Sequence, residues 1–158
     1  NPVIYFENKV LFKQKGMVPD GEYTVPIGKA NVVKMGSDVT IVSYSIMMNT
    51  VLEAAEALEK DGISAEVVDL RTISPIDKET ILNSVAKTKR LVVAHEAVKQ
   101  GGVGAEISAI VAEEAIDSLD APILRFGAPF VPIPFAPTLE KGVRVSVEDI
   151  VNGVKRMF

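Results

Sequence analysis

The single histidine of the chain, His95, directly precedes Glu96 and follows the apolar run Leu91–Ala94. Ligands bind at the carboxyl ends of strands in open α/β sheets, and an imidazole there could act as an acid, a base or a hydrogen-bond donor. No second histidine and no Ser or Asp partner motif accompanies it. We therefore favour a structural His95, fixed by Glu96 or by backbone, and keep a catalytic His95 as the alternative.

A glycine-rich turn, Gly101–Gly104, follows this run and precedes a helical pattern. Free backbone N–H groups at such a turn could bind a phosphate or carboxylate, which makes Gly102 and Gly104 candidate anion-binding residues. A dinucleotide fingerprint needs glycine where this chain has Ile107, and it belongs after the first strand of the repeat. The simpler interpretation is a tight strand-to-helix turn.

Asp69, Arg71 and Thr72 leave the end of another predicted strand. The planar guanidinium of Arg71 could bind an anion through two parallel hydrogen bonds, so Arg71 is a further anion-binding candidate. We favour the plainer interpretation, an ion pair of Arg71 with Asp69 or with a neighbouring loop.

Four acidic residues crowd the end of the predicted helix 103–119: Glu113, Glu114, Asp117 and Asp120. The negative end of a helix prefers Lys or Arg, so each acid there costs about 0.3–1 kcal/mol. No Lys or Arg occurs from residue 100 to residue 124, so no base nearby in the sequence offsets them. The cluster is either a solvated acidic face or a docking patch for a basic partner.

Composition excludes several classes of protein. The 158 residues include 17 Lys and Arg against 21 Asp and Glu, a net charge of −4 that argues against nucleic acid and against a polybasic membrane anchor. The absence of Cys and the single His exclude disulfides, thiolate sites and two-His metal sites, so no metal-binding residue is predicted. No signal peptide or membrane span is visible, and a cytoplasmic location is expected.

Strand and helix patterns alternate along the chain. Apolar runs predict strands at 29–34, 39–44, 65–70, 91–94 and 123–126. Helical spacing and capping residues predict helices at 47–58, 74–85, 103–119 and 146–157, with an irregular loop over the four prolines of 129–137. This alternation predicts an α/β fold with a mostly parallel sheet covered on both faces.

Residues 1–24 differ from the rest, because an apolar run is followed by Lys, Gly, Pro and Asp without a period. We interpret them as an arm and linker from an upstream domain, with an edge strand of the same domain as the alternative. The domain itself is then expected to span 25–158.

Several stretches together resemble one family, the C-terminal half of the beta subunit of thiamine-diphosphate-dependent 2-oxo acid dehydrogenases. They are residues 1–9, 27–30, 38–44, 69–77, 95–96, 101–107 and 120–122. The segment 128–140 looks most like the acetoin dehydrogenase branch, then pyruvate dehydrogenase, then the branched-chain enzyme.

The resemblance implies a transketolase C-terminal fold, a three-layer α/β/α sandwich with a mostly parallel five-stranded sheet. It implies an α2β2 tetramer of two beta and two alpha subunits, and an upstream pyrimidine-binding domain to which the arm 1–24 belongs. The family's thiamine diphosphate and Mg²⁺ sites lie outside the region matched, so this chain alone should be inactive and hold no cofactor-binding or catalytic residue.

The resemblance also implies a docking role. Family members dock the small basic subunit-binding domain of the lipoyl acyltransferase through an acid before Ala-Pro, here Asp120, and a C-terminal aromatic carboxylate, here Phe158. Glu113, Glu114 and Asp117 would extend that surface. The leading hypothesis is therefore an assembly and docking domain. The alternatives are a stand-alone anion-binding regulatory domain and a small enzyme that uses His95.

Overall fold

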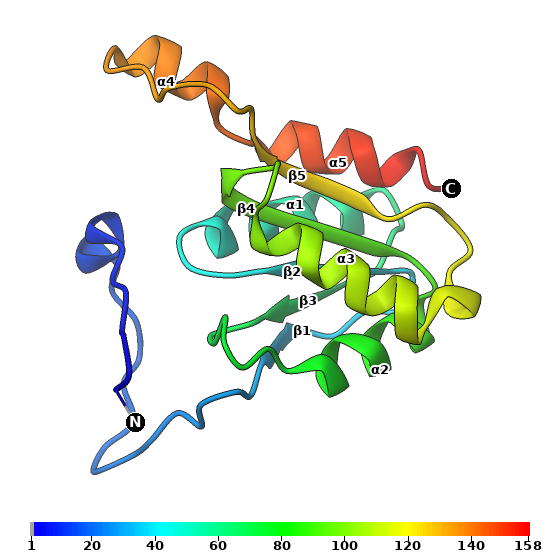
Figure 1. Ribbon diagram of the computed structural model, residues 1–158, viewed down its shortest axis with the longest axis horizontal. Coiled ribbons are helices and arrows are strands. Elements are labelled where there is room, and N and C mark those ends of the chain that lie inside the picture. The colour runs from blue at the N-terminus through cyan, green and yellow to red at the C-terminus, as the bar shows by residue number, and fades with distance from the viewer. Residues whose placement is uncertain (1) are drawn as a thin grey trace.

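A five-stranded sheet forms the middle layer of the computed structural model, which describes residues 2–158 (Figure 1). The strands lie in the order β1-β3-β2-β4-β5. β2 to β5 run parallel, whereas β1 pairs with β3 in the antiparallel sense. Their bounds are β1 Asn31–Lys34, β2 Val39–Ser43, β3 Ala65–Asp69, β4 Leu91–Val98 and β5 Leu124–Ala128.

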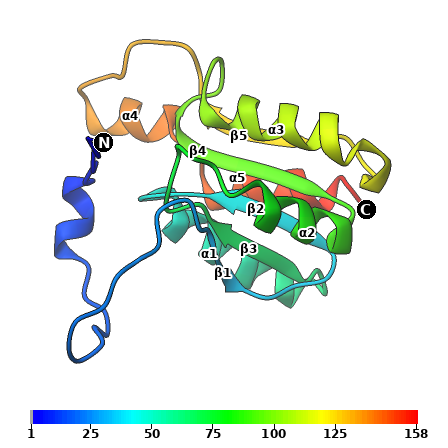
Figure 2. The same ribbon diagram turned by 60° about the horizontal axis from the view of Figure 1, so that its bottom comes forward.

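Helices cover both faces of this sheet (Figure 2). α1 and α5 pack on one face, and α2 and α3 pack on the other. The predicted α/β/α sandwich with a mostly parallel five-stranded sheet is therefore confirmed. The helices are η1 Lys9–Lys13, α1 Met47–Lys60, α2 Lys78–Thr88, α3 Val103–Glu114, η2 Ile116–Ser118, α4 Pro137–Val143 and α5 Val147–Lys155.

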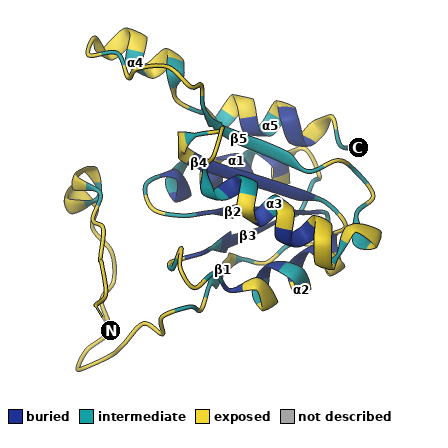
Figure 3. Ribbon diagram, viewed as in Figure 1, coloured by how far each residue is buried: buried dark blue, intermediate teal, exposed yellow. Residues whose placement is uncertain are grey.

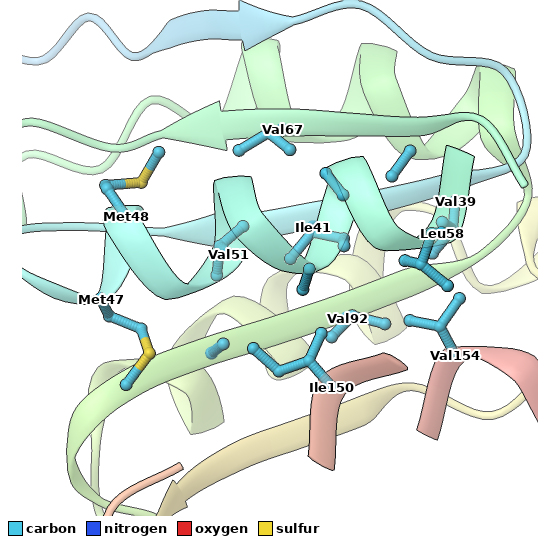
Figure 4. Close-up of a cluster of buried hydrophobic side chains, with 14 residues drawn as sticks. Val39, Ile41, Met47, Met48, Val51, Leu58, Val67, Val92, Ile150 and Val154 are labelled. Carbon is cyan, nitrogen blue, oxygen red and sulfur yellow. The ribbon is translucent and has the colours of Figure 1, made fainter. Parts of the chain in front are cut away.

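Two apolar clusters lie between the layers. The first joins α1 and α5 to the sheet, and it includes Met47, Met48 and Val51, whose helical spacing predicts a core position (Figure 4). The second joins α2 and α3 to the opposite face, with Ile81 and Ile107 fully buried. Each such side chain contributes about 1.5–3 kcal/mol on burial, so both helical layers are held mainly by apolar contact.

Two predicted helix boundaries are wrong. α2 begins at Lys78, not at Ser74, because the buried Asp77 side chain accepts the Thr80 N–H at 3.2 Å and is the N-cap. α3 ends at Glu114, because Ala115 leaves the helical conformation with φ −150°, and a short 3-10 turn, η2, follows. Asp117 and Asp120 consequently lie beyond the helix.

Two other expectations are also corrected. The predicted strand 91–94 continues to Val98, so His95 and Glu96 lie within β4 rather than after it. Pro137, the last proline of the predicted irregular loop, begins the helix α4, since proline fits the first turn of a helix without losing a hydrogen bond.

The segments before β1 and around α4 are the most exposed parts of the described chain (Figure 3). Residues 2–27 touch the sandwich through the side chains of Asn8, which donates to Glu96, and Gln14, which pairs with Asn49. Phe6, Phe130 and Phe135 are largely exposed. Asn1, the first residue of the predicted arm, lies outside the described residues. Among residues 2–158, every helix is too short or too polar to cross a lipid bilayer.

Candidate partner-docking site

The turn between α2 and β4, Lys89–Arg90, connects the two residues that the resemblance assigns to docking. The Asp120 backbone N–H donates to the Lys89 carbonyl at 2.8 Å. Arg90 Nε donates to the Met157 carbonyl at 3.1 Å, and the Arg90 guanidinium lies 4.1 Å from the centre of the Phe158 ring. Asp120 and Phe158 are therefore held on either side of one two-residue turn.

We call this surface the docking corner and define it by Lys89, Arg90, Asp117, Asp120 and Phe158. It lies at the amino ends of β4 and β5, on the side of the molecule that carries the end of α3 and the C-terminus (Figure 2). Asp117 and Asp120 are exposed, and Phe158 keeps 59% of its surface accessible. The corner can thus be reached by a partner, with an apolar ring beside carboxylates.

The other two acids of the predicted patch have a different environment. Glu114 Oε1 accepts a hydrogen bond from Lys78 Nζ at 2.7 Å, and this bond raises the pKa of Lys78. The base that offsets the negative charge at the end of α3 is therefore Lys78 on α2, 36 residues earlier in the chain. The residues next to Glu114 in the sequence do not indicate this pairing. Glu113 is exposed one residue earlier on α3. The predicted uniform patch is better described as an acid–base pair beside a corner that also contains Lys89 and Arg90.

His95 is fully buried at the carboxyl half of the sheet. Its Nδ1 lies 3.0 Å from the Ala97 carbonyl, which assigns the proton to Nδ1, and its Nε2 has no hydrogen-bond partner among the described residues. Burial lowers the pKa of His95, and the nearby Arg125 charge lowers it further. The imidazole is thus neutral and enclosed, an arrangement suited to packing and not to substrate contact.

Three glycines form the walls around that ring. A Cβ added at Gly102, Gly104 or Gly127 would lie 2.7, 2.8 or 2.8 Å from an atom of the His95 ring. Real Cβ atoms do not approach so closely, so each position must lack a side chain. The lack of side chains at Gly102 and Gly104 is therefore explained by the imidazole beside them, and anion binding by the backbone N–H groups of this turn stays a prediction.

The third candidate group surrounds the end of β3. Asp69 Oδ1 accepts the backbone N–H of Arg71 at 3.2 Å, and burial raises the pKa of Asp69. The Arg71 side chain is exposed, and its backbone has a positive φ of 55°. Arg71 follows β3, whereas Gly102 follows β4, with β2 between them. The structure therefore does not combine the predicted anion-binding residues into one site.

No cluster of three or more His, Cys, Asp or Glu side chains within residues 2–158 could hold a metal ion. At the glycine-rich turn, a side chain at Gly102 or Gly104 would meet the His95 ring, whereas one at Gly101 would meet nothing within 4 Å.

Comparison with known proteins identifies the family. The profile of the transketolase C-terminal domain matches residues 28–150, so the chain belongs to the transketolase C-terminal domain family. Its homologues are E1 beta subunits of pyruvate, acetoin and 2-oxoisovalerate dehydrogenases. A solved split-gene transketolase, described as an inactive beta4 tetramer, superposes with a TM-score of 0.76 at 33% identity over 91% of this chain and 45% of its own.

Two relatives illustrate the similarity. The mitochondrial pyruvate dehydrogenase E1 component subunit beta of Dictyostelium discoideum is 51% identical, over 99% of this chain and 45% of its own. The acetoin:2,6-dichlorophenolindophenol oxidoreductase subunit beta of Cupriavidus necator is 49% identical, over 89% and 41%. The chain spans about half the length of these relatives. Identities this similar do not choose between pyruvate and acetoin as substrate.

Proposed function

We propose that the chain is the assembly and docking part of the beta subunit of a thiamine-diphosphate-dependent 2-oxo acid or acetoin dehydrogenase. Homology to E1 beta subunits supports the subunit role. The observation that carries the docking role is the Lys89–Arg90 turn, which holds Asp120 and Phe158 together at one exposed corner.

The chemistry of the docking corner fits a small basic domain. The Asp120 carboxylate and the Phe158 ring are exposed on either side of the Lys89–Arg90 turn, and the α-carboxylate of Phe158 adds a second anion where that residue ends the subunit. An arginine of the partner can bind a carboxylate through two charge-assisted hydrogen bonds. We propose the subunit-binding domain of the lipoyl acyltransferase as that partner.

We further propose that thiamine diphosphate and Mg²⁺ bind elsewhere in the enzyme, and that a second beta subunit and two alpha subunits complete it. The residues of this chain support that division, because within 2–158 no cluster of three or more His, Cys, Asp or Glu side chains could hold a metal ion. Titration calorimetry of the isolated chain with the cofactor and Mg²⁺ tests this part. No saturable heat is expected, and micromolar binding would contradict it. A cytoplasmic location remains part of the proposal.

Surface plasmon resonance of the assembled beta subunits against the subunit-binding domain tests the docking role. Asp120→Ala and deletion of Phe158 should raise the off-rate, because removing one partner of a charge pair that is buried in the complex costs about 2–5 kcal/mol. Glu113→Gln, outside the corner, should mainly reduce the salt-dependent on-rate. If all three variants bind like the parent at low and high salt, the corner is not the docking surface.

A further inference from the structure

An open cleft of about 470 Å³ lies between the carboxyl end of β5 and one face of α5. Its floor is formed by Phe126 and Gly127, and the segment between α4 and α5 closes one side. The charged and amide side chains that line it are Lys99, Arg125, Arg144, Arg156, Asp149 and Asn152.

The charge of this cleft is opposite to that of the whole chain. Four cations and one anion line it, a formal balance of +3, whereas the chain carries −4. The one acid, Asp149, is already used as a helix cap. Its Oδ2 accepts hydrogen bonds from the Ser146 backbone N–H at 2.9 Å and from the Ser146 hydroxyl at 2.7 Å. Asp149 keeps its charge in this role, and Arg144 pairs with Glu140 one turn earlier in the chain. Lys99, Arg125 and Arg156 are the cations of the cleft for which the described residues show no ion pair.

The cationic side chains are placed by ordered elements. Arg125, half-buried on β5, donates from Nη1 to the Lys99 carbonyl at 3.3 Å. Asp149 and Asn152 on α5 and Arg156 at its C-cap follow helical spacing, and the preceding residue, Lys155, pairs instead with Asp61 at 2.7 Å. The helix thus turns one of its two C-terminal cations into the cleft and the other away from it.

The floor beneath these cations is closely packed. A Cβ on Gly127 would lie 3.0 Å from Lys99 Cα, and one on Gly153 would lie 2.3 Å from the Phe126 ring. Gly127 and Gly153 therefore allow β5 to approach β4 and α5 to approach Phe126. The lining is therefore mixed, with the apolar side chains of Phe126, Val143 and Val145 beside those of arginine and lysine.

We propose that this cleft binds a small organic anion that carries a phosphate group or more than one carboxylate. Arginine forks bind both groups through paired, charge-assisted hydrogen bonds. The volume of the cleft lies within the usual range for small-molecule sites, about 300–1,000 Å³. The net negative charge of the chain and the small concave shape disfavour nucleic acid as the occupant.

Most of the cleft lies away from the docking corner, although its Arg156 stands two residues before Phe158. Lys99, Gly127 and Arg144 lie at the carboxyl ends of the strands or beyond them, whereas Lys89 and Asp120 lie before the amino ends of β4 and β5. Loss of anion binding and loss of partner docking can therefore be observed separately.

NMR titration of the ¹⁵N-labelled 158-residue chain tests the proposal, with pyrophosphate and citrate as probes at constant ionic strength. At least one probe should give saturable shifts of amides in 99–101, 125–129 and 144–156, and the probe that binds identifies phosphate or carboxylate as the preferred group. The double variant Arg125→Gln/Arg156→Gln should weaken that binding by about tenfold or more.

Lys155→Gln is the matched control, because it removes a cation from the same helix on the face away from the cleft, and it should bind within about twofold of the parent. If the double variant unfolds in a thermal scan, Arg156→Gln alone, on an exposed side chain, replaces it and should still weaken binding. Absence of saturation with both probes overturns the proposal. Equal weakening of binding by Lys155→Gln also overturns the proposal. So does a set of amide shifts that the cleft variants leave unchanged, because a surface elsewhere that binds acidic peptides would give that result.

Discussion

The His95 imidazole determines which residues its neighbours can be. It is fully buried, and Gly102, Gly104 and Gly127 leave it the space that any larger residue would occupy. Gly104 is the most informative of them, because it is the second residue of α3 and a Cβ there would lie 2.8 Å from His95 Nε2. The first turn of α3 thus lacks a side chain where the His95 ring packs.

Gly104→Ala should destabilise the protein by about 1–3 kcal/mol, because its Cβ would lie 2.8 Å from His95 Nε2. Urea denaturation measures the difference. Gly142→Ala in α4 is the control: a Cβ there meets nothing within 4 Å, so that variant should be neutral or slightly stabilising. In a His95→Ala background the Gly104→Ala penalty should shrink. Equal midpoints for the two glycine variants would show that the ring does not fill this space.

Protonation of His95 should weaken the fold in mild acid. Burial lowers the pKa of His95 in the folded state, so between that pKa and the unfolded value of about 6.5 the unfolded chain binds more protons. Its contribution to stability is full above about pH 6.5 and is lost as the pH falls toward the folded pKa. The free energy of unfolding should therefore decline from pH 7.5 to pH 5.5. His95→Gln should flatten that decline, and an unchanged slope would exclude His95 as its source.

At the scale of single residues, the sequence drew attention to His95 and its nearby glycines but did not show which of them contact one another. His95 and the glycines at 101–104 stand close together in the chain, so a shared role could be suspected. Gly127 is 32 residues from His95 in numbering and reaches it only because β5 pairs with β4. Lys78 and Glu114 meet in the same way, through the packing of α2 beside α3. Such pairings depend on strand and helix placement that no local pattern contains.

At the scale of elements, Asp77 connects the entry of the domain to α2. Its carboxylate accepts the Ala30 N–H at 2.9 Å, the Thr80 N–H at 3.2 Å and the Thr80 hydroxyl at 2.8 Å. Burial opposes its charge, but these hydrogen bonds hold the pKa of Asp77 below its ordinary value. One side chain therefore begins a helix and fixes the segment just before β1.

Asp77→Ala should cost about 0.5–2 kcal/mol for the lost cap, and more because the Ala30 N–H loses its acceptor. Asp77→Asn keeps an acceptor for Thr80 and should recover much of that loss. Hydrogen exchange should show faster exchange in 78–81 and near Ala30 for the alanine variant. Unchanged exchange at both places would mean that the first turn of α2 is held by its apolar contacts alone.

The element pattern was largely predictable, because buried parallel strands form continuous apolar runs and the helices have clear apolar faces. The errors fall where local signals conflict with packing. Ser74-Pro75 carries a helix-start signal, yet Asp77 caps α2. Ile116 and Leu119 continue a helical period, yet the chain turns through η2. Proline at 137 marked a break and instead opened α4.

At the scale of the whole molecule, the amino and carboxyl ends of the parallel strands carry different charged groups. The docking corner lies at the amino ends of β4 and β5, and the cationic cleft lies at the carboxyl end of β5. The docking candidates Asp120 and Phe158 came from the family resemblance. Their joint anchoring by Lys89 and Arg90 was not predictable, because it depends on where α5 ends relative to β4.

The central claim is the location of docking, and hydrogen–deuterium exchange on the assembled beta subunits tests it most directly, with and without the subunit-binding domain of the lipoyl acyltransferase. The account predicts slower exchange on binding at 89–90, 117–121 and 157–158, with α1 and β1 unchanged. The account would be contradicted if the partner bound and slowed hydrogen exchange only in α1 or β1, with no slowing at the docking corner.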